Sequence, residues 1–229
     1  MIKIKNKVKK NYSYFNNIFY SYFLRKYRKQ IFKIFLENII INKAFKVIDI
    51  GTTAVDSLNE NYFLHNYPYK KKITCFSNQK LTSLKKKYPF LKILQGDGRQ
   101  TNLPSNYYDI VHSNATIEHV GSFYNQSIFI KELYRISKKF VFIQTPNRFF
   151  PIDFHTLIPF IHFLPKKLHR SILKIIGLKF ISKEENLNLL TINELRKICI
   201  DQNIKEFYVK KIRIFGLTSN IILVIKKIN

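Results

Sequence analysis

The chain has 229 residues, a length that suits one α/β domain with additions and is short for two domains. Its 40 lysine and arginine residues against 14 acidic residues give a formal net charge of +26, which usually indicates a nucleic-acid or anionic-membrane partner. The sequence excludes a disulfide framework, because Cys75 and Cys199 lie far apart in separate apolar runs, and no apolar run reaches the roughly 18 residues of a membrane-spanning helix.

The high charge has a second explanation, which is drift toward AT-rich codons. The chain is crowded with Ile, Lys, Asn, Phe and Tyr and poor in Gly, Ala and Trp, and its basic residues are 32 lysines and 8 arginines. Arginine is the better donor to phosphate, so selection for a nucleic-acid partner would favour arginine. We therefore regard codon drift as the larger cause of the charge.

Residues 1–43 form a basic segment with apolar side chains at helical spacing. A basic helix with an aromatic face could lie on a membrane surface or along a nucleic-acid backbone. The alternative, which we favour, is a helix packed on the domain edge with its lysines in solvent. The positions that define the apolar face are Phe15, Ile18, Phe19, Tyr22, Phe23, Ile31, Ile34, Phe35 and Asn38.

From residue 46 onward, short apolar runs rich in β-forming residues alternate with longer polar segments of helical character. This alternation predicts parallel strands joined by crossover helices, which is a doubly wound, Rossmann-like α/β sheet. The predicted strands are 46–50, 73–77, 91–95, 108–112 and 139–144, and the predicted helices are 79–88 and 122–137.

An apolar, proline-punctuated insertion follows the fifth predicted strand, over residues 151–190. Pro159 and Pro165 break any single long helix within it. We therefore expect short helices that form a cap on the domain.

The end of the chain closes the sheet. After a helix at 191–203, the runs 206–215 and 219–227 suit an antiparallel pair at the sheet's edge. The sheet is then seven-stranded and mostly parallel, with an antiparallel C-terminal strand. The expected organisation is a helical extension at 1–43 and one sheet domain with its cap at 44–229.

The first predicted strand ends in Asp49-Ile50-Gly51, followed by Thr52 and Thr53. In doubly wound sheets, ligands bind outside the carboxyl ends of the strands, near the point where the strand order reverses. Gly51 allows a turn and a close approach to a ligand, and the threonines offer hydroxyl and N–H groups. Taken alone, this stretch is explained better by an ordinary strand-to-helix turn.

Polar residues also follow the second and third strands. A nucleoside site normally has an acid after the second strand for the ribose hydroxyls, but this chain has Ser77 and Asn78, of which Asn78 could equally cap a helix. After the third strand, Asp97 stands between Gly96 and Gly98, where it could accept a hydrogen bond from an exocyclic amine of a closely approaching base. The alternative is a tight turn with a solvated aspartate.

The fourth predicted strand brings a third group of polar residues to the same edge. Asn114, Glu118 and His119 follow this strand at its carboxyl end, whereas Asp109 precedes its buried part. The sequence therefore predicts a polar cluster where a ligand of a doubly wound sheet would lie.

Three motifs together resemble a known family. The succession VIDIG, GDGRQTNLPSNYYDIVHSNATIEHV and FIKELYRISKKFVFIQTPNRFFP is similar to class I S-adenosylmethionine-dependent methyltransferases of the type-11 group, over residues 46 to about 150. The segments FPIDFHTLIPFIHFLP and EENLNLL further resemble a bacterial subgroup found among cell-surface polysaccharide enzymes. Three motifs at compatible spacing are far more specific than one.

The resemblance implies that S-adenosylmethionine is the cofactor, and it gives the strand-end residues their roles. Asp49 and Gly51 would lie beside the methionine moiety, which Asn114 would line through its backbone carbonyl. Asp97 would hold the adenine amine, with Gly98 next to it. The other expected cofactor residues are Thr52, Thr53, Ser77 and Asn78.

The chain departs from the family pattern at two places. Thr53 and Val55 stand where the family has its second and third glycines. The family's acid for the ribose is missing at Ser77 and Asn78. Both departures concern contacts with the cofactor rather than with the methyl acceptor.

Glu118 and His119 would face the acceptor. His119 is the first candidate for the general base, and His155 in the cap is the second. Proton transfer to such a positioned base typically contributes about 10²–10⁴-fold. A structural hydrogen bond at the start of a helix is an equal alternative for His119.

No metal site is expected from the histidine pattern. His155, His162 and His169 recur every seven residues, but the prolines between them prevent the single helix that would align them. Neither a carboxylate nor a cysteine cluster accompanies them in the sequence. We expect these histidines to pack within the cap.

The expected function is methyl transfer from S-adenosylmethionine to oxygen or nitrogen of a small-molecule, sugar or lipid-linked acceptor in cell-surface glycan biosynthesis. The expected location is the cytoplasm, including the inner face of the membrane, which the basic N-terminal helix and the cap could contact. One alternative is a degenerate, non-enzymatic binding or scaffold protein, which the missing glycines and acid favour. The other is an RNA methyltransferase, although no (Asn/Asp)-Pro-Pro-aromatic tetrad follows the fourth strand.

Overall fold

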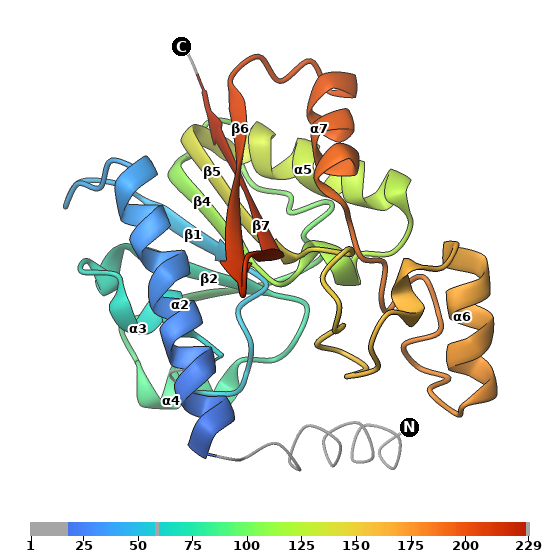
Figure 1. Ribbon diagram of the computed structural model, residues 1–229. Coiled ribbons are helices and arrows are strands. Elements are labelled where there is room, and N and C mark those ends of the chain that lie inside the picture. The colour runs from blue at the N-terminus through green and yellow to red at the C-terminus, as the bar shows by residue number, and fades with distance from the viewer. Residues whose placement is uncertain (1–17, 58–59, 228–229) are drawn as a thin grey trace.

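A computed structural model describes residues 18–57 and 60–227 of the chain. Its centre is a seven-stranded sheet of order β3-β2-β1-β4-β5-β7-β6, in which β7 runs antiparallel to both of its neighbours (Figure 1). The order reverses between β1 and β4, which pair in parallel. The predicted doubly wound, mostly parallel sheet is therefore confirmed.

The elements follow the predicted rhythm. The strands are β1 Val47–Ile50, β2 Ile73–Ser77, β3 Lys92–Gln95, β4 Tyr108–Asn114, β5 Ser137–Pro146, β6 Phe207–Ile214 and β7 Leu217–Lys226. The α-helices are α2 Ile18–Asn38, α3 Tyr62–Asn66, α4 Thr82–Lys87, α5 Phe123–Ile136, α6 Lys166–Ile175 and α7 Ile192–Asp201. Short 3-10 turns are η1 Lys70–Lys72, η2 Ile117–His119 and η3 Ile161–Phe163.

The sheet is buried on both faces, because alternate residues of each strand enter different cores. In β1, Ile48 and Ile50 pack with Phe129 of α5 and Leu195 of α7, whereas Val47 packs on the opposite face with α2, α3 and α4. Figure 1 shows this division, with α2, α3 and α4 on one side of the strands and α5 and α7 on the other.

Helix α2 belongs to the second of these cores. Ile31, Phe35 and Ile39 repeat every four residues and are buried against Phe63 of α3 and Phe142 of β5. The lysines at 26, 29 and 33 are exposed. The described part of the helix thus packs on the domain with its lysines in solvent. The predicted face positions Phe15, Ile18, Phe19, Tyr22 and Phe23 lie outside the residues whose side chains are described.

The cap consists of short helices, as its prolines predicted. The turn η3 lies between Pro159 and Pro165, and α6 begins directly after Pro165. His162 and His169 are both buried there, and the His162 Nε2–H donates to the Phe150 carbonyl at 2.6 Å. Within residues 18–57 and 60–227, no helix has both the length and the apolar character needed to cross a membrane.

Candidate active site

A cleft of about 520 Å³ opens at the carboxyl ends of the parallel strands, beside the point where the strand order reverses. The ends of β1, β2, β3 and β4 all contribute to it, which is where a doubly wound sheet binds its ligand. Eight of the predicted site residues line this cleft. They are Gly51, Thr52, Thr53, Ser77, Asn78, Asp97, Gly98 and His119.

The other four predicted residues lie around this cleft. Asp49 and Asn114 line a smaller adjoining pocket of about 30 Å³, which shares Gly51 and Thr52 with the cleft. Glu118 is fully buried next to His119, and His155 reaches the same place from the cap. The predicted site residues are therefore brought to one edge of the sheet.

The turn after β1 uses most of its own hydrogen-bond donors internally. The Gly51 and Thr52 N–H groups both donate to the Phe76 carbonyl, at 2.8 and 3.3 Å. The Thr53 N–H donates to the Asn61 side-chain oxygen at 3.3 Å, and the Thr52 hydroxyl lies 2.9 Å from an Asp49 carboxylate oxygen. The Thr53 hydroxyl in turn accepts from the Val55 N–H at 3.3 Å, so both threonines hold the turn in shape.

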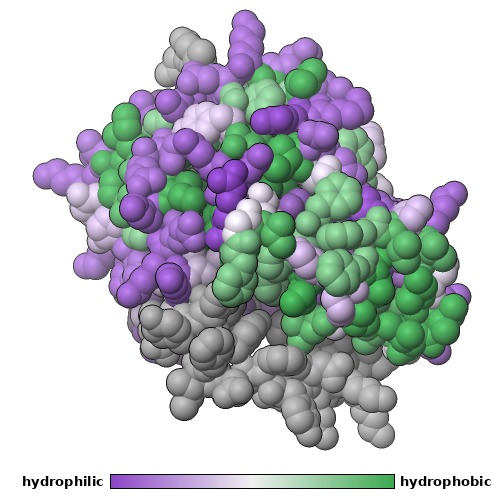
Figure 2. All heavy atoms as spheres, viewed as in Figure 1, coloured by the Kyte–Doolittle hydropathy of each residue, from purple (hydrophilic) through white to green (hydrophobic). Residues whose placement is uncertain are grey.

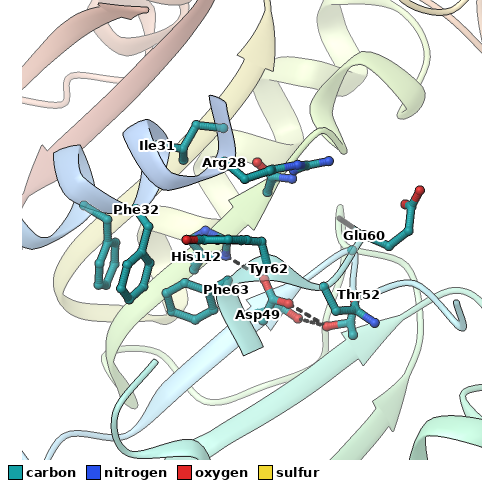
Figure 3. A pocket seen from close by; sticks show the side chains of 13 residues that line it. Arg28, Ile31, Phe32, Asp49, Thr52, Glu60, Tyr62, Phe63 and His112 are labelled. Atoms are coloured by element: carbon teal, nitrogen blue, oxygen red, sulfur yellow. Dashed lines mark hydrogen bonds and ion pairs between the residues drawn. The ribbon is translucent and has the colours of Figure 1, made fainter. Parts of the chain in front are cut away.

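Asp49 is the centre of a buried polar network rather than a residue of the cleft wall (Figure 3). Its Oδ1 lies 2.6 Å from His112 Nδ1, and its Oδ2 accepts from the Thr52 hydroxyl. The His112 ring is stacked on Phe63 at 3.8 Å between centroids and lies parallel to Phe142 at 5.7 Å. This network fixes the position of the turn that follows β1.

The glycines after β3 are required by packing. A Cβ added to Gly98 would lie 2.7 Å from the Phe129 ring, and one added to Gly96 would lie 2.8 Å from the Phe76 ring. The packing gives these glycines a role inside the protein, and their predicted role of letting a base approach stays a prediction. Because the two glycines have no side chains, Phe76 and Phe129 pack directly against the loop, and both rings line the cleft.

Asp97 is held by the neighbouring Arg99. The guanidinium donates from Nε and Nη2 to the Asp97 carboxylate, and the Arg99 N–H donates to Asp97 Oδ1 at 2.8 Å. These hydrogen bonds from Arg99 keep the pKa of the Asp97 carboxyl below its usual value. The carboxylate therefore stays ionised and keeps acceptor capacity for a ligand amine.

Arg28 is a pocket residue that the sequence analysis missed. Figure 3 shows it extending from α2 over the smaller pocket, whose wall also carries Asp49, Thr52 and Glu60. Its Nε–H is buried and has no partner among the described residues. The sequence signal that could have identified Arg28 is the rarity of arginine, since the chain has 8 arginines and 32 lysines. In the larger cleft, the missed residues include Arg99, Thr116 and Glu185.

Glu118, His119 and His155 form a cluster beside the cleft, of which His119 is a lining residue. One nitrogen or oxygen atom from each lies within 4.8 Å of the others. The His119 Nδ1–H donates to the Asn186 carbonyl at 2.7 Å, and His155 Nδ1 lies 2.9 Å from Asp153 Oδ1. Both histidines are therefore fixed through Nδ1, which leaves Nε2 as the free ring nitrogen.

Burial and pairing act in opposite directions on the pKa values of Asp153 and His155. Burial alone would raise the Asp153 pKa, but the hydrogen bonds and charge of His155 outweigh it and lower this pKa to about 2. Burial would likewise lower the His155 pKa, but the hydrogen bond and charge of Asp153 outweigh it and raise this pKa. His155 therefore keeps a proton more readily than an ordinary histidine does.

Residues 49–142 match a protein family described as a methyltransferase domain. A search of curated proteins found no matching sequence. The matched residues run from Asp49 in β1 to Phe142 within β5, and they contain the strand ends that form the cleft.

Solved structures share the fold at low sequence identity. A possible histamine N-methyltransferase from Thermotoga maritima, solved as a SAM-dependent methyltransferase, is 15% identical with a TM-score of 0.58, covering 99% of this chain and 100% of its own. A SAM-dependent methyltransferase from Archaeoglobus fulgidus is 14% identical with a TM-score of 0.55, and the match covers 89% of this chain and 94% of that one. A phosphoethanolamine N-methyltransferase from Haemonchus contortus, bound to S-adenosylmethionine, is 12% identical with a TM-score of 0.56. That match covers 80% of this chain and 38% of the other. Residues 49–142 of this chain are thus similar to a methyltransferase domain, and the chain shares the fold of solved structures described as S-adenosylmethionine-dependent methyltransferases.

Proposed function

We propose that the protein transfers the methyl group of S-adenosylmethionine to an oxygen or nitrogen atom of a small-molecule, sugar or lipid-linked acceptor. The observation that carries this proposal is the cleft at the strand-order reversal, lined by residues of all the motifs that resemble methyltransferases. Its volume of about 520 Å³ falls within the range of about 300–1,000 Å³ typical of small-molecule sites.

The residues of the cleft fit the parts of this cofactor. Phe76 and Phe129, which pack beside the glycines that flank Asp97, give the cleft apolar walls, and we assign the Asp97 carboxylate to the adenine amine. Ser77 and Asn78 offer neutral hydrogen bonds to the ribose hydroxyls in place of an acid. We assign Gly51, Thr53 and the Asn114 backbone to the methionine end, next to the Asp49 network.

Arg28 supports the same assignment through its charge. A half-buried guanidinium whose buried Nε–H has no partner among the described residues is suited to bind a carboxylate, and the smaller pocket connects it with Gly51 and Asn114. The methionine moiety of S-adenosylmethionine carries the carboxylate in question. We therefore assign Arg28 to the methionine carboxylate.

The acceptor end is formed by Glu118, His119 and His155. When bound, S-adenosylmethionine supplies an electrophilic methyl group on a sulfonium, and alignment of the reacting atoms contributes about 7–11 kcal/mol. His119 Nε2 is free and open to solvent, so it accepts the proton of an acceptor hydroxyl. His155, held by Asp153, is the second candidate for this role.

The first prediction concerns cofactor binding. Titration with S-adenosylmethionine and S-adenosylhomocysteine should stabilise the protein by about 2.7 kcal/mol at a hundredfold excess over Kd, which raises the melting temperature by roughly 5–10 °C. Arg28→Gln should weaken binding by about tenfold, because a charge-assisted hydrogen bond contributes about 1.5–3 kcal/mol. Isothermal titration calorimetry measures the dissociation constants of the parent protein and of the Arg28→Gln variant.

The matched control is Lys29→Gln, which removes a neighbouring exposed charge from the same helix and should leave the affinity unchanged. No shift at millimolar cofactor would overturn the proposal and favour the scaffold alternative. Saturable, salt-sensitive RNA binding would instead favour the RNA methyltransferase alternative.

The cap supports a lipid-linked acceptor, in keeping with the proposed role in cell-surface glycan synthesis at the cytoplasmic membrane face. Figure 2 shows apolar side chains gathered over α6 and the cap. Their exposed members include Phe149, Phe160, Phe163, Leu168, Ile175, Ile176 and Phe180. Lysines of α6, including Lys167 and Lys174, are exposed on the same helix and suit anionic lipid headgroups.

The second prediction tests this contact. The protein should sediment with phosphatidylglycerol vesicles and less with phosphatidylcholine vesicles, because lysines and apolar side chains act together. Ile175→Ser/Ile176→Ser should reduce sedimentation several-fold, whereas Ile200→Ser on the exposed end of α7 should not. Equal sedimentation of all three proteins would contradict a membrane contact through the cap.

A further inference from the structure

We propose that Glu118, His119 and His155 form a binding site for a divalent transition-metal ion, such as Zn²⁺, at the acceptor end of the cleft. The inference starts from the donor set. Two imidazole nitrogens and one carboxylate oxygen lie within 4.8 Å of one another. Zn²⁺ commonly takes this combination in catalytic sites, which keep a further position open for water or substrate.

Glu118 provides a second and independent observation. It is fully buried, and its Oε2 accepts from the Thr145 hydroxyl at 2.9 Å. Its Oε1 is also buried and has no hydrogen-bond partner among the residues that the structure describes. A buried carboxylate oxygen without a partner is costly in a folded protein, and a bound cation next to it removes that cost.

The surroundings orient each ligand as metal sites require. Asp153 holds His155 through Nδ1, and the Asn186 carbonyl holds His119 through Nδ1. Each Nε2 is therefore the nitrogen that carries the lone pair when the ring is neutral, and it is left for a metal ion. A carboxylate or carbonyl behind each imidazole is the usual support of a metal-binding histidine.

The distances allow binding after a small adjustment. Ligands bonded to zinc at about 2.0 Å in a tetrahedral arrangement lie about 3.3 Å apart. The atoms here lie within 4.8 Å, so they must approach by about 1.5 Å at most. His119 is exposed, so its side chain has room for a small movement about its hydrogen bond to the Asn186 carbonyl.

The site also narrows the acceptor class, a step that rests on the proposed function. His119 lines the cleft, so an ion bound to its Nε2 lies where the acceptor enters. A metal ion lowers the pKa of an oxygen ligand, which favours an acceptor hydroxyl over an amine. In the reaction, the O–H bond breaks and its proton passes to solvent, while the O–CH₃ bond forms as the S–CH₃ bond breaks. The ion then takes over the task of the His119 base.

The test measures metal binding without any cofactor. Tag-free protein that has been treated with a chelator and then freed of it is titrated with Co²⁺, followed by visible absorption, and Zn²⁺ is then used to displace it. We expect one ion per chain. His155→Gln and Glu118→Gln should each lower the affinity at least a hundredfold, and Asp153→Asn should lower it about 10–100-fold through orientation of His155.

The matched control is His65→Gln. His65 forms the same kind of pair, with its Nε2 at 2.9 Å from Asp56 Oδ1, but it lies outside the cluster, so its loss should not change binding. A stoichiometry near zero would overturn the metal site. So would a metal affinity of the His155→Gln and Glu118→Gln variants equal to that of the parent protein. S-adenosylmethionine binding is measured separately in chelator, so failure of the metal site and failure of the proposed function give different results.

Discussion

Replacing Gly51 by alanine is expected to weaken S-adenosylmethionine binding by about thirtyfold, or about 2 kcal/mol, and to destabilise the fold. Gly51 has a φ of +96°, a conformation that costs an L-residue about 1–2 kcal/mol. An added Cβ would also lie 2.0 Å from the Thr116 hydroxyl oxygen and 2.9 Å from the Thr116 Cβ. Because the Thr116 Cβ itself is too close, a change of its rotamer does not relieve the contact, and the turn must move.

Movement of this turn matters for binding because Gly51 lines both the cleft and the smaller pocket. The measurement is calorimetric titration with cofactor, together with unfolding in denaturant. Gly177→Ala is the matched control, since Gly177 has a similar φ of +84° but nothing within 4 Å of its added Cβ. It should lose stability through backbone strain alone and bind normally. Normal cofactor binding by the Gly51 variant would disprove the prediction.

Replacing Asp49 by alanine is expected to lower the free energy of unfolding by about 3 kcal/mol. The change leaves the His112 ring nitrogen without its partner inside a core where His112 is 3% exposed. A buried polar group that loses its partner costs about 1–3 kcal/mol, and a charged one about 3–5 kcal/mol. Urea unfolding, read at the midpoint with an unchanged slope, measures this difference.

Two further variants separate the network from the general effect of losing an acid. Asp109→Ala removes only an exposed hydrogen bond from the Lys46 N–H, and it should cost less than about 1 kcal/mol. Asp49→Leu/His112→Phe replaces both partners by apolar groups, so it should recover most of the stability. A stability of Asp49→Ala within 1 kcal/mol of the parent protein would count against a structural role for this network.

The sheet was predictable because its signals are local and repeated. The apolar runs predict strands within a few residues of their observed bounds, and the alternation with helices predicts the parallel order. Pro159 and Pro165 likewise predict short cap helices. These features depend on neighbouring residues, so one sequence was enough to locate them.

The detailed site was less predictable because it depends on which way side chains turn. The sequence predicts Asp49 as a cofactor residue but does not reveal its contact with His112, which is 63 positions away. The heptad of cap histidines suggested packing, whereas His155 leaves that group and joins Glu118 and His119. The glycines beside Asp97 are explained by Phe76 and Phe129, which come from other elements. Contacts across such separations are set by tertiary packing.

The position of β7 has a consequence for biosynthesis. This strand lies between β5 and β6, although it is made after both. While a ribosome is still adding residues 217–226, the edge of β5 has no antiparallel partner and β6 has no neighbour to pair with. An unpaired strand edge of this kind invites association with other chains. The nascent chain therefore exposes this edge until β7 has been made, and a chain cut after Gly216 is expected to associate with other chains more readily than the parent protein.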